Sequence, residues 1–165
     1  MITILEAGLK DIKIIQEITN VTWPITYGEI LSKMQLDYML GLFYSDEALA
    51  KQIENKEQLF YLISDSKSTI GFIGIEHNYN DEAITKIHKI YLLPETQGKG
   101  IGKKVIEEIQ KLALENNSEA LFLNVNRFNT ALGFYKKIGF EIKEEVNIEI
   151  GNGYLMEDYV MEKKI

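Results

Sequence analysis

The chain has no cysteine among its 165 residues, and it has only two histidines and two prolines. The lack of cysteine excludes disulfides, thiolate metal sites and cysteine nucleophiles. Two histidines are too few for a histidine-built metal site without help from carboxylates, so we expect no metal. Hydrophobic runs long enough to span a membrane are also missing. These absences point away from metal-dependent and membrane-embedded functions.

Basic residues are in the minority, because 18 Lys and Arg face 25 Asp and Glu and give a formal net charge of −7. Nucleic-acid binders normally carry a basic patch, so this charge argues against a nucleic-acid partner. It favours a cationic partner such as a polyamine, although solubility alone explains it equally well. The first residues lack a basic stretch followed by an apolar run, so we expect no signal peptide and a cytoplasmic location.

Hydrophobic residues make up 45% of the chain and charged residues 26%, which is ordinary for a globular protein. A chain of this length can build one hydrophobic core. No internal repeat, low-complexity tract or linker interrupts it. We therefore expect a single domain over residues 1–165.

One glycine-rich stretch follows a predicted strand and precedes a predicted helix. It consists of Gln97, Gly98, Lys99, Gly100, Ile101, Gly102 and Lys103. Alternate glycines remove side chains where the unpaired backbone N–H groups of a helix start emerge, and such a start attracts an anion. The stretch predicts a phosphate-binding turn, with a capped turn that binds no ligand as the alternative.

Spacing excludes two kinds of nucleotide site. A dinucleotide fold needs G-x-G-x-x-G with an acidic residue about 20 positions later. Here the pattern is G-x-G-x-G, and that later region is the apolar 121–123. A Walker loop needs G-x-x-x-x-G-K-[ST], but Gly98 to Gly102 is one residue short and Lys104 replaces the hydroxyl.

Periodicity and turn residues predict the order of the elements. A helix is expected over 9–21 and is broken at Trp23-Pro24, with short helices over 25–32 and 36–42 and another that Ser45 caps. Strands are expected at 2–5, 58–63, 69–79, 83–93, 121–125, 140–150 and 154–164. Two more helices are expected at 101–116 and 130–137, and Gly139 ends the second.

Two motifs in this order resemble those of the GNAT superfamily of N-acetyltransferases. Gln97-x-x-Gly100-x-Gly102 is similar to the family's (R/Q)-x-x-G-x-(G/A) loop, and residues 134–140 are similar to its F-Y-x-x-x-G-F segment. The resemblance covers nearly the whole chain. It implies a mixed α/β fold, with an antiparallel meander, one βαβ unit, a C-terminal hairpin and helices on both faces of the sheet. Spermidine/spermine-type and other small-molecule members look most similar.

The resemblance also implies acetyl-CoA as cofactor and CoA as product. The loop Gln97–Lys103 would hold the pyrophosphate, and the backbone of Ile90 and Leu92 would pair with the pantetheine arm. The Leu92 N–H would polarise the thioester carbonyl. Asn124 and Asn129 are further candidates for cofactor contacts. Asn129 stands one residue nearer to the F-Y pair than family spacing expects, so a helix-capping role is equally open.

The remaining roles concern catalysis and the acceptor. By resemblance, Tyr135 would protonate the leaving thiolate, with packing against the sheet as the alternative. His88 would be the general base, because an imidazole titrates near neutrality; Glu76, His77, water and a purely structural histidine are alternatives. Substrate-binding candidates are Trp23, Tyr27 and Glu29, since aromatic rings beside a carboxylate suit an amine; a core or dimer contact would use the same residues.

We therefore predict an acetyl-CoA-dependent transferase, an acyltransferase of the N-acetyltransferase type, that acts on a primary amine of a small molecule. Acetylation of a protein N-terminus or lysine is one alternative. A catalytically idle acetyl-CoA-binding module is another. The terminal hairpin could pair across a homodimer, as in some relatives.

Overall fold

The computed structural model describes all 165 residues. Its strands are β1 (Thr3–Glu6), β2 (Leu59–Ser64), β3 (Thr69–His77), β4 (Ile84–Leu92), β5 (Ala120–Asn126), β6 (Glu141–Glu149) and β7 (Leu155–Lys164). Its α-helices are α1 (Ile12–Tyr27), α2 (Lys33–Tyr44), α3 (Asp46–Glu54), α4 (Ile101–Glu115) and α5 (Ala131–Lys137). Three short 3-10 helices complete it: η1 (Leu9–Asp11), η2 (Tyr79–Asp81) and η3 (Pro94–Thr96).

The seven strands form one mixed sheet in the order β1-β2-β3-β4-β5-β7-β6. Backbone contacts divide the chain into two compact units, each with its own part of this sheet. The first unit comprises residues 1–76 and 88–109, and the second comprises 77–87 and 110–165. None of the helices is both long and apolar enough to cross a membrane.

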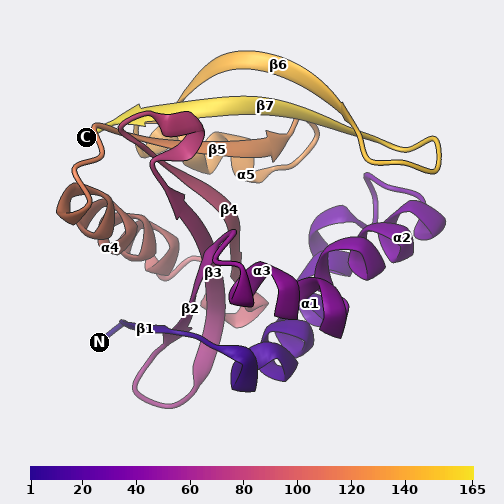
Figure 1. The fold of residues 1–165 in the computed structure, drawn as a ribbon, viewed down its shortest axis with the longest axis horizontal. Helices are drawn as coiled ribbons and strands as arrows, with labels where there is room; N and C mark the ends of the chain where they lie inside the picture. Colours follow the sequence, from indigo (N-terminus) through magenta and orange to yellow (C-terminus); the bar gives the residue numbers. More distant parts are fainter. The chain divides into compact units, whose positions relative to one another are not determined.

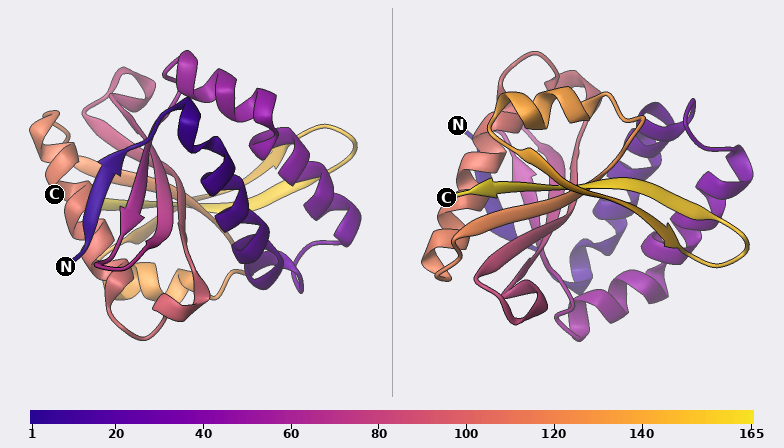
Figure 2. Two further views of the ribbon diagram at one scale, coloured as in Figure 1. Left: turned by 90° about the horizontal axis from the view of Figure 1, so that it is seen from below. Right: turned by 90° about the horizontal axis from the view of Figure 1, so that it is seen from above.

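The first unit holds the antiparallel part of the sheet. β1 pairs with β2, and β2 pairs with β3, both antiparallel. α1 and α3 lie on one side of β2 and β3, and the first half of α4 lies on the other (Figures 1 and 2). Fully buried side chains fill the space between these layers, among them Ile15, Leu49, Phe60, Phe72 and Ile106. The predicted meander with helices on both faces is confirmed.

One helix prediction is wrong. α1 continues through Pro24 to Tyr27, where the sequence predicted a break and a new helix. A proline within a helix removes one backbone hydrogen bond and normally kinks or ends it. Here Pro24 and Asn20, whose carbonyl would accept that bond, are both exposed. Water can therefore solvate the carbonyl, while buried Trp23 packs the same turn into the unit.

Most other elements lie close to their predicted positions. Ser45 caps α3 as expected, because its Oγ accepts a hydrogen bond from the Ala48 N–H at 3.1 Å. α2 is longer than predicted, since Ser32 caps it through the Gln35 N–H at 3.1 Å. Ends of the strands differ from the predictions by only one or two residues.

The second unit holds the parallel pair and the C-terminal hairpin. Ile84–Ile87 of β4 run parallel to Ala120–Leu123 of β5, as the predicted βαβ unit requires. β7 pairs antiparallel with both β5 and β6. β6 is the edge strand and is exposed along most of its length, visible in Figure 1 as the outer strand of the hairpin. Pairing of this hairpin across a homodimer stays a prediction.

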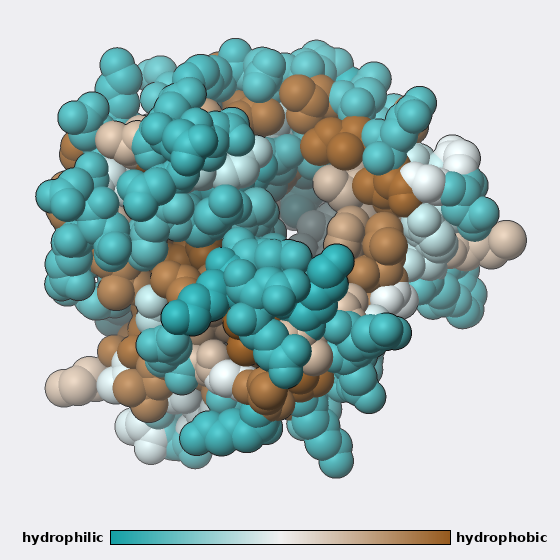
Figure 3. Space-filling view, viewed as in Figure 1, coloured by the Kyte–Doolittle hydropathy of each residue, from teal (hydrophilic) through white to brown (hydrophobic).

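The face of the molecule shown in Figure 3 is mostly hydrophilic, with hydrophobic side chains showing between the polar ones. This agrees with a charged fraction of 26% and a net charge of −7. Apolar residues scattered on a surface are normal for globular proteins and need no partner to explain them.

Candidate active site

The glycine loop has the backbone of an anion site. Gly98 and Gly100 adopt φ angles of +73° and +70°, which L side chains rarely take. A Cβ built on either glycine would meet nothing within 4 Å, so the space over the loop is open. η3 precedes the loop and holds its start in place, because the buried Thr96 hydroxyl donates a hydrogen bond to the Leu93 carbonyl at 2.7 Å.

The helix start beyond this loop offers unpaired donors. The Lys104 N–H donates to the Gly100 carbonyl at 3.3 Å, and the N–H groups before it precede the first complete turn of α4. No acidic residue stands in the first turn to compete for them. Lys99 and Lys103 are exposed on either side. The predicted loop residues can therefore hold a pyrophosphate group.

At the end of β4, the backbone N–H and C=O groups of successive residues point toward opposite edges of the strand. The Leu93 N–H donates to the Ile70 carbonyl of β3 at 2.8 Å. The Tyr91 carbonyl also faces β3, where a Cβ on Gly71 would lie 2.4 Å from it. Since successive residues of a strand alternate, Ile90 and Leu92 direct their N–H and C=O groups to the other edge. Those groups can pair with an extended ligand.

The aromatic substrate candidates lie in one cluster of the first unit. The Trp23 ring lies 4.7 Å from that of Tyr27, 5.4 Å from Tyr44 and 6.0 Å from Tyr91. The hydroxyls of Tyr27 and Tyr91 are 3.2 Å apart, so one donates to the other. Burial raises the pKa of Tyr44. Trp23 is buried as well, so Tyr27 and Tyr91 form the more accessible part of the cluster.

The third substrate candidate does not join this cluster. Glu29 lies exposed in the turn after α1, and no hydrogen bond or ion pair ties its carboxylate to the aromatic rings. Nothing in the sequence indicates that Tyr44 and Tyr91 contact Trp23. Their contacts depend on the docking of α2 and β4 against α1.

A buried lysine lies beneath the same helices. The Lys89 Nζ donates to Gln52 Oε1 at 2.7 Å and to Gln58 Oε1 at 2.9 Å. It also lies 5.2 Å from the centre of the Phe60 ring. Burial lowers the pKa of Lys89 to about 7, although the negative charge of Glu57 opposes this. Neutral amide oxygens, rather than a carboxylate, therefore satisfy this ammonium group.

The structure brings two of the candidate bases together. His88 Nε2 lies 2.7 Å from Glu76 Oε2, and both side chains are partly buried. A carboxylate in this position fixes the orientation of the imidazole. His88 and Glu76, which the sequence left as alternatives, thus form one pair in the first unit.

The other histidine has a different environment. His77 Nδ1 lies 2.7 Å from Thr85 Oγ1, which in turn lies 2.7 Å from Ser118 Oγ. Burial lowers the pKa of His77, which favours the neutral ring. Thr85 and Ser118 are both buried. This hydrogen-bonded chain ties β3, β4 and the start of β5 together, and it has the features of a structural histidine.

Tyr135 lies on α5 in the second unit and is buried. Its ring packs against Phe134 at 5.3 Å and Phe140 at 5.7 Å between centres. Gly139 ends the helix as predicted, with a φ of +103°. Asn129 Oδ1 accepts a hydrogen bond from the Ala131 N–H at 2.9 Å, so this oxygen supports the start of α5.

At the end of β5, the cofactor candidate Asn124 contacts Asp158, a residue that the sequence did not indicate. Asn124 Nδ2 donates to Asp158 Oδ2 at 3.5 Å, and Asp158 is only 6% exposed. Asn124 Oδ1 is buried and has no hydrogen-bond partner. Burial raises the pKa of Asp158, although Asn124 and the charges of Arg127 and Lys86 oppose this. In the sequence, Asp158 follows Glu157 within a predicted strand and belongs to no motif.

The chain is similar to known proteins that belong to the family suggested by the two motifs. The family described as "Acetyltransferase (GNAT) domain" matches residues 32–163. The spermidine N(1)-acetyltransferase of Thermoplasma acidophilum is 27% identical over 168 residues, which cover 99% of this chain and 97% of that protein. The peptidyl-lysine N-acetyltransferase YjaB of Salmonella typhimurium is 31% identical over 122 residues, covering 72% of this chain and 75% of that protein.

A solved structure extends the similarity to the whole fold. The PaiA N-acetyltransferase of Thermoplasma acidophilum, crystallised in complex with coenzyme A, superposes with a TM-score of 0.81 at 27% identity. The match covers 100% of this chain and 99% of that one. The expectation drawn from the two motifs is confirmed: the chain belongs to the GNAT family of acetyltransferases and is an N-acetyltransferase.

Proposed function

We propose that this enzyme transfers the acetyl group of acetyl-CoA directly to a primary amine of a small molecule, and that polyamines are the acceptor class. The observation that carries this proposal is the similarity along the whole chain to a spermidine N(1)-acetyltransferase. A net charge of −7 supports a cationic acceptor. Similarity to a protein crystallised with coenzyme A supports the donor.

The glycine loop would bind the pyrophosphate of the donor through the backbone N–H groups at the start of α4. Bound acetyl-CoA supplies the thioester carbonyl that an amine attacks. The outward-facing backbone groups of Ile90 and Leu92 would pair with the pantetheine arm. The Leu92 N–H would then donate to the carbonyl oxygen, where negative charge develops during the attack.

Two protons must move during the reaction. The His88 imidazole would accept one from the ammonium group, so that the nitrogen lone pair can attack, and Glu76 would hold the ring in place. The Tyr135 hydroxyl would give its own proton to the departing thiolate sulfur, and the second proton lost by the amine nitrogen would replace it on Tyr135. The first role is supported by the short contact between His88 and Glu76. The second rests on the position of Tyr135 in the F-Y-x-x-x-G-F motif.

Acetylation of peptidyl lysine is the second candidate function. Similarity to YjaB, at 31% identity over 72% of this chain, favours it. A lysine side chain and a polyamine both present a primary ammonium group on a flexible alkyl chain. The two candidates therefore differ in what lies beyond that group, and a comparison of acceptors separates them.

The test is a thiol-release assay with acetyl-CoA and a panel of acceptors. The panel contains spermidine, spermine, free amino acids, an aminoglycoside, and a peptide with one internal lysine. We expect turnover with the polyamines and a much lower kcat/KM with the peptide. If only the peptide is acetylated, peptidyl lysine replaces polyamines as the acceptor class. If no acceptor in the panel causes release of CoA, the proposed function is refuted.

A further inference from the structure

The end of β5 and the start of β7 bring together polar groups whose hydrogen bonds are incomplete, namely Asn124 Oδ1, Arg127 Nε and the Asp158 carboxylate. Asn124 lies opposite Val160, and Asn126 lies opposite Asp158, in the antiparallel register of these strands. Asn124 and Asp158 therefore lie diagonally across one face of the sheet. The same face is apolar further along, where Phe122 packs with Ile84 and Ala120. Polar groups thus begin where the apolar cluster ends.

Nothing in the second unit neutralises Asp158 directly. Its carboxylate accepts only the long hydrogen bond from Asn124 Nδ2, at 3.5 Å. The two cations that act on it electrostatically are Arg127 and Lys86. Neither forms an ion pair with it. The terminal nitrogens of the Arg127 guanidinium bind Glu145 and Asn147, and its buried Nε has no hydrogen-bond partner.

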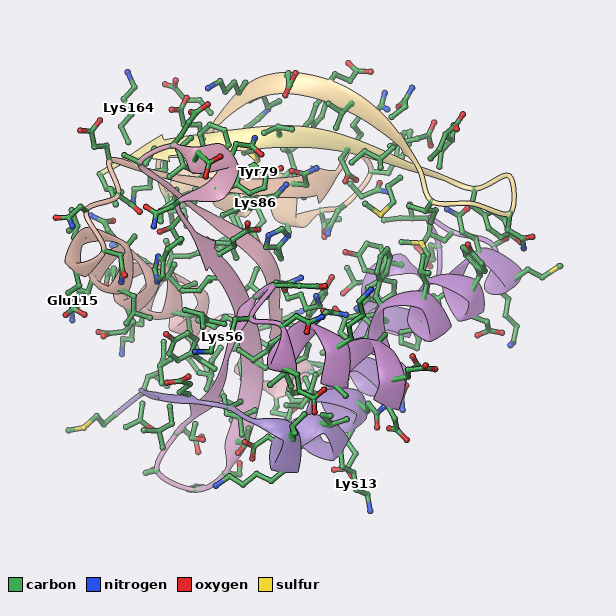
Figure 4. All side chains as sticks on the ribbon, viewed as in Figure 1. Lys13, Lys56, Tyr79, Lys86, Glu115 and Lys164 are labelled. Atoms are coloured by element: carbon green, nitrogen blue, oxygen red, sulfur yellow. The ribbon has the colours of Figure 1, made fainter.

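Lys86 is also committed elsewhere. Its Nζ donates to the Tyr79 hydroxyl at 3.1 Å and lies 4.3 Å from the centre of the Tyr79 ring, and Figure 4 shows the two side chains next to each other. Moving a carboxylate from water into the protein interior costs free energy unless a cation pairs with it. Burying an amide oxygen without a hydrogen-bond donor also costs free energy. A positively charged N–H donor would stabilise both the Asp158 carboxylate and Asn124 Oδ1.

We propose that Asn124 Oδ1 and the Asp158 carboxylate form a subsite for a primary ammonium group of the acceptor. An ammonium group carries three donors and one positive charge, so a single ligand atom satisfies the orphaned amide oxygen and the buried carboxylate together. Two acceptor oxygens exclude an anionic ligand. This subsite deepens the proposed function and rests on it. It gives Asn124 a role toward the acceptor rather than toward the cofactor.

The matched variants are Asp158→Asn and Glu157→Gln. The first keeps the shape of the side chain and removes its charge, and the second removes one charge from the neighbouring exposed side chain. Spermidine is titrated into each protein saturated with CoA, so that no turnover occurs. Loss of the charged partner of a buried pair should weaken spermidine binding by about 30-fold or more. Glu157→Gln should bind like the wild type, and all three proteins should bind CoA equally.

Thermal unfolding of the ligand-free proteins supplies the second readout. If Asp158 serves a ligand, Asp158→Asn removes a desolvated charge, and Tm should stay unchanged or rise. A structural role predicts a lower Tm instead. Unchanged spermidine affinity in Asp158→Asn, or a loss of CoA affinity in its place, would overturn the subsite.

The subsite and the proposed function fail in different ways. A wild-type enzyme that acetylates polyamines, with an unaltered KM for them in Asp158→Asn, refutes the subsite alone. A wild-type protein that neither binds spermidine nor acetylates any amine of the panel refutes both.

Discussion

Lys89 should make the folded protein more stable at pH 9 than at pH 7. Burial lowers the pKa of this lysine from 10.5 to about 7 in the folded state. The folded state therefore binds fewer protons than the unfolded state across the interval between these values. Stability rises with pH wherever the unfolded state binds more protons, so the cost of the buried ammonium group declines from about pH 7 upward.

The size of this effect follows from the two pKa values. One pKa unit corresponds to about 1.4 kcal/mol. At pH 7 half of the folded molecules have already lost the Lys89 proton, and at pH 9 nearly all have, while the unfolded lysine stays charged. The free energy of unfolding should therefore increase by about 2 kcal/mol between pH 7 and pH 9 because of Lys89 alone.

The assay compares the wild type with Lys89→Met in urea at both pH values. Trp23 is the single tryptophan and is buried, so its fluorescence reports unfolding. Methionine keeps the length of the side chain but cannot titrate. It also leaves the Gln52 and Gln58 oxygens without their donor, which costs roughly 1–3 kcal/mol for each group at any pH. Only the pH-dependent part of the difference therefore reports the buried charge.

Lys33→Met is the matched control, because the Lys33 side chain is 88% exposed. This variant should follow the pH dependence of the wild type, since the Lys33 side chain lies in solvent in the folded protein as it does in the unfolded chain. If the wild type and Lys89→Met differ in unfolding free energy by the same amount at pH 7 and pH 9, burial does not lower the pKa of Lys89.

Three further predictions concern the candidate active site. Gly100→Val should weaken acetyl-CoA binding, measured by calorimetry, by at least about tenfold. The reason is that a β-branched residue disfavours the left-handed backbone conformation that Gly100 adopts. Gly41→Ala, in α2, is the control and should bind acetyl-CoA like the wild type. Tyr135→Phe should lower kcat by about 100-fold while KM for acetyl-CoA stays the same, and wild-type turnover would leave this tyrosine a packing residue only. His88→Ala should also lower kcat by about 100-fold, whereas His77→Ala should lower Tm and leave kcat close to the wild-type value.

Local sequence determined the parts of the protein that depend on backbone geometry and short-range pattern. Alternate glycines predicted the turn before α4, because few other residues adopt its positive φ angles. Ser45 and Gly139 marked the ends of their helices through capping and backbone chirality. The order of strands and helices, together with two motifs at the right separation, was enough to identify the family.

Tertiary structure decided where side chains from distant segments meet. The pairing of His88 with Glu76 depends on the register of adjacent strands, and sequence alone left these two residues as rival bases. α1 continues through Pro24 because solvent exposure of the missing hydrogen bond and packing of Trp23 outweigh the local preference of proline. Asp158 belongs to no motif in the sequence. Only the packing of β7 beside β5 shows that it is buried next to an amide oxygen without a donor.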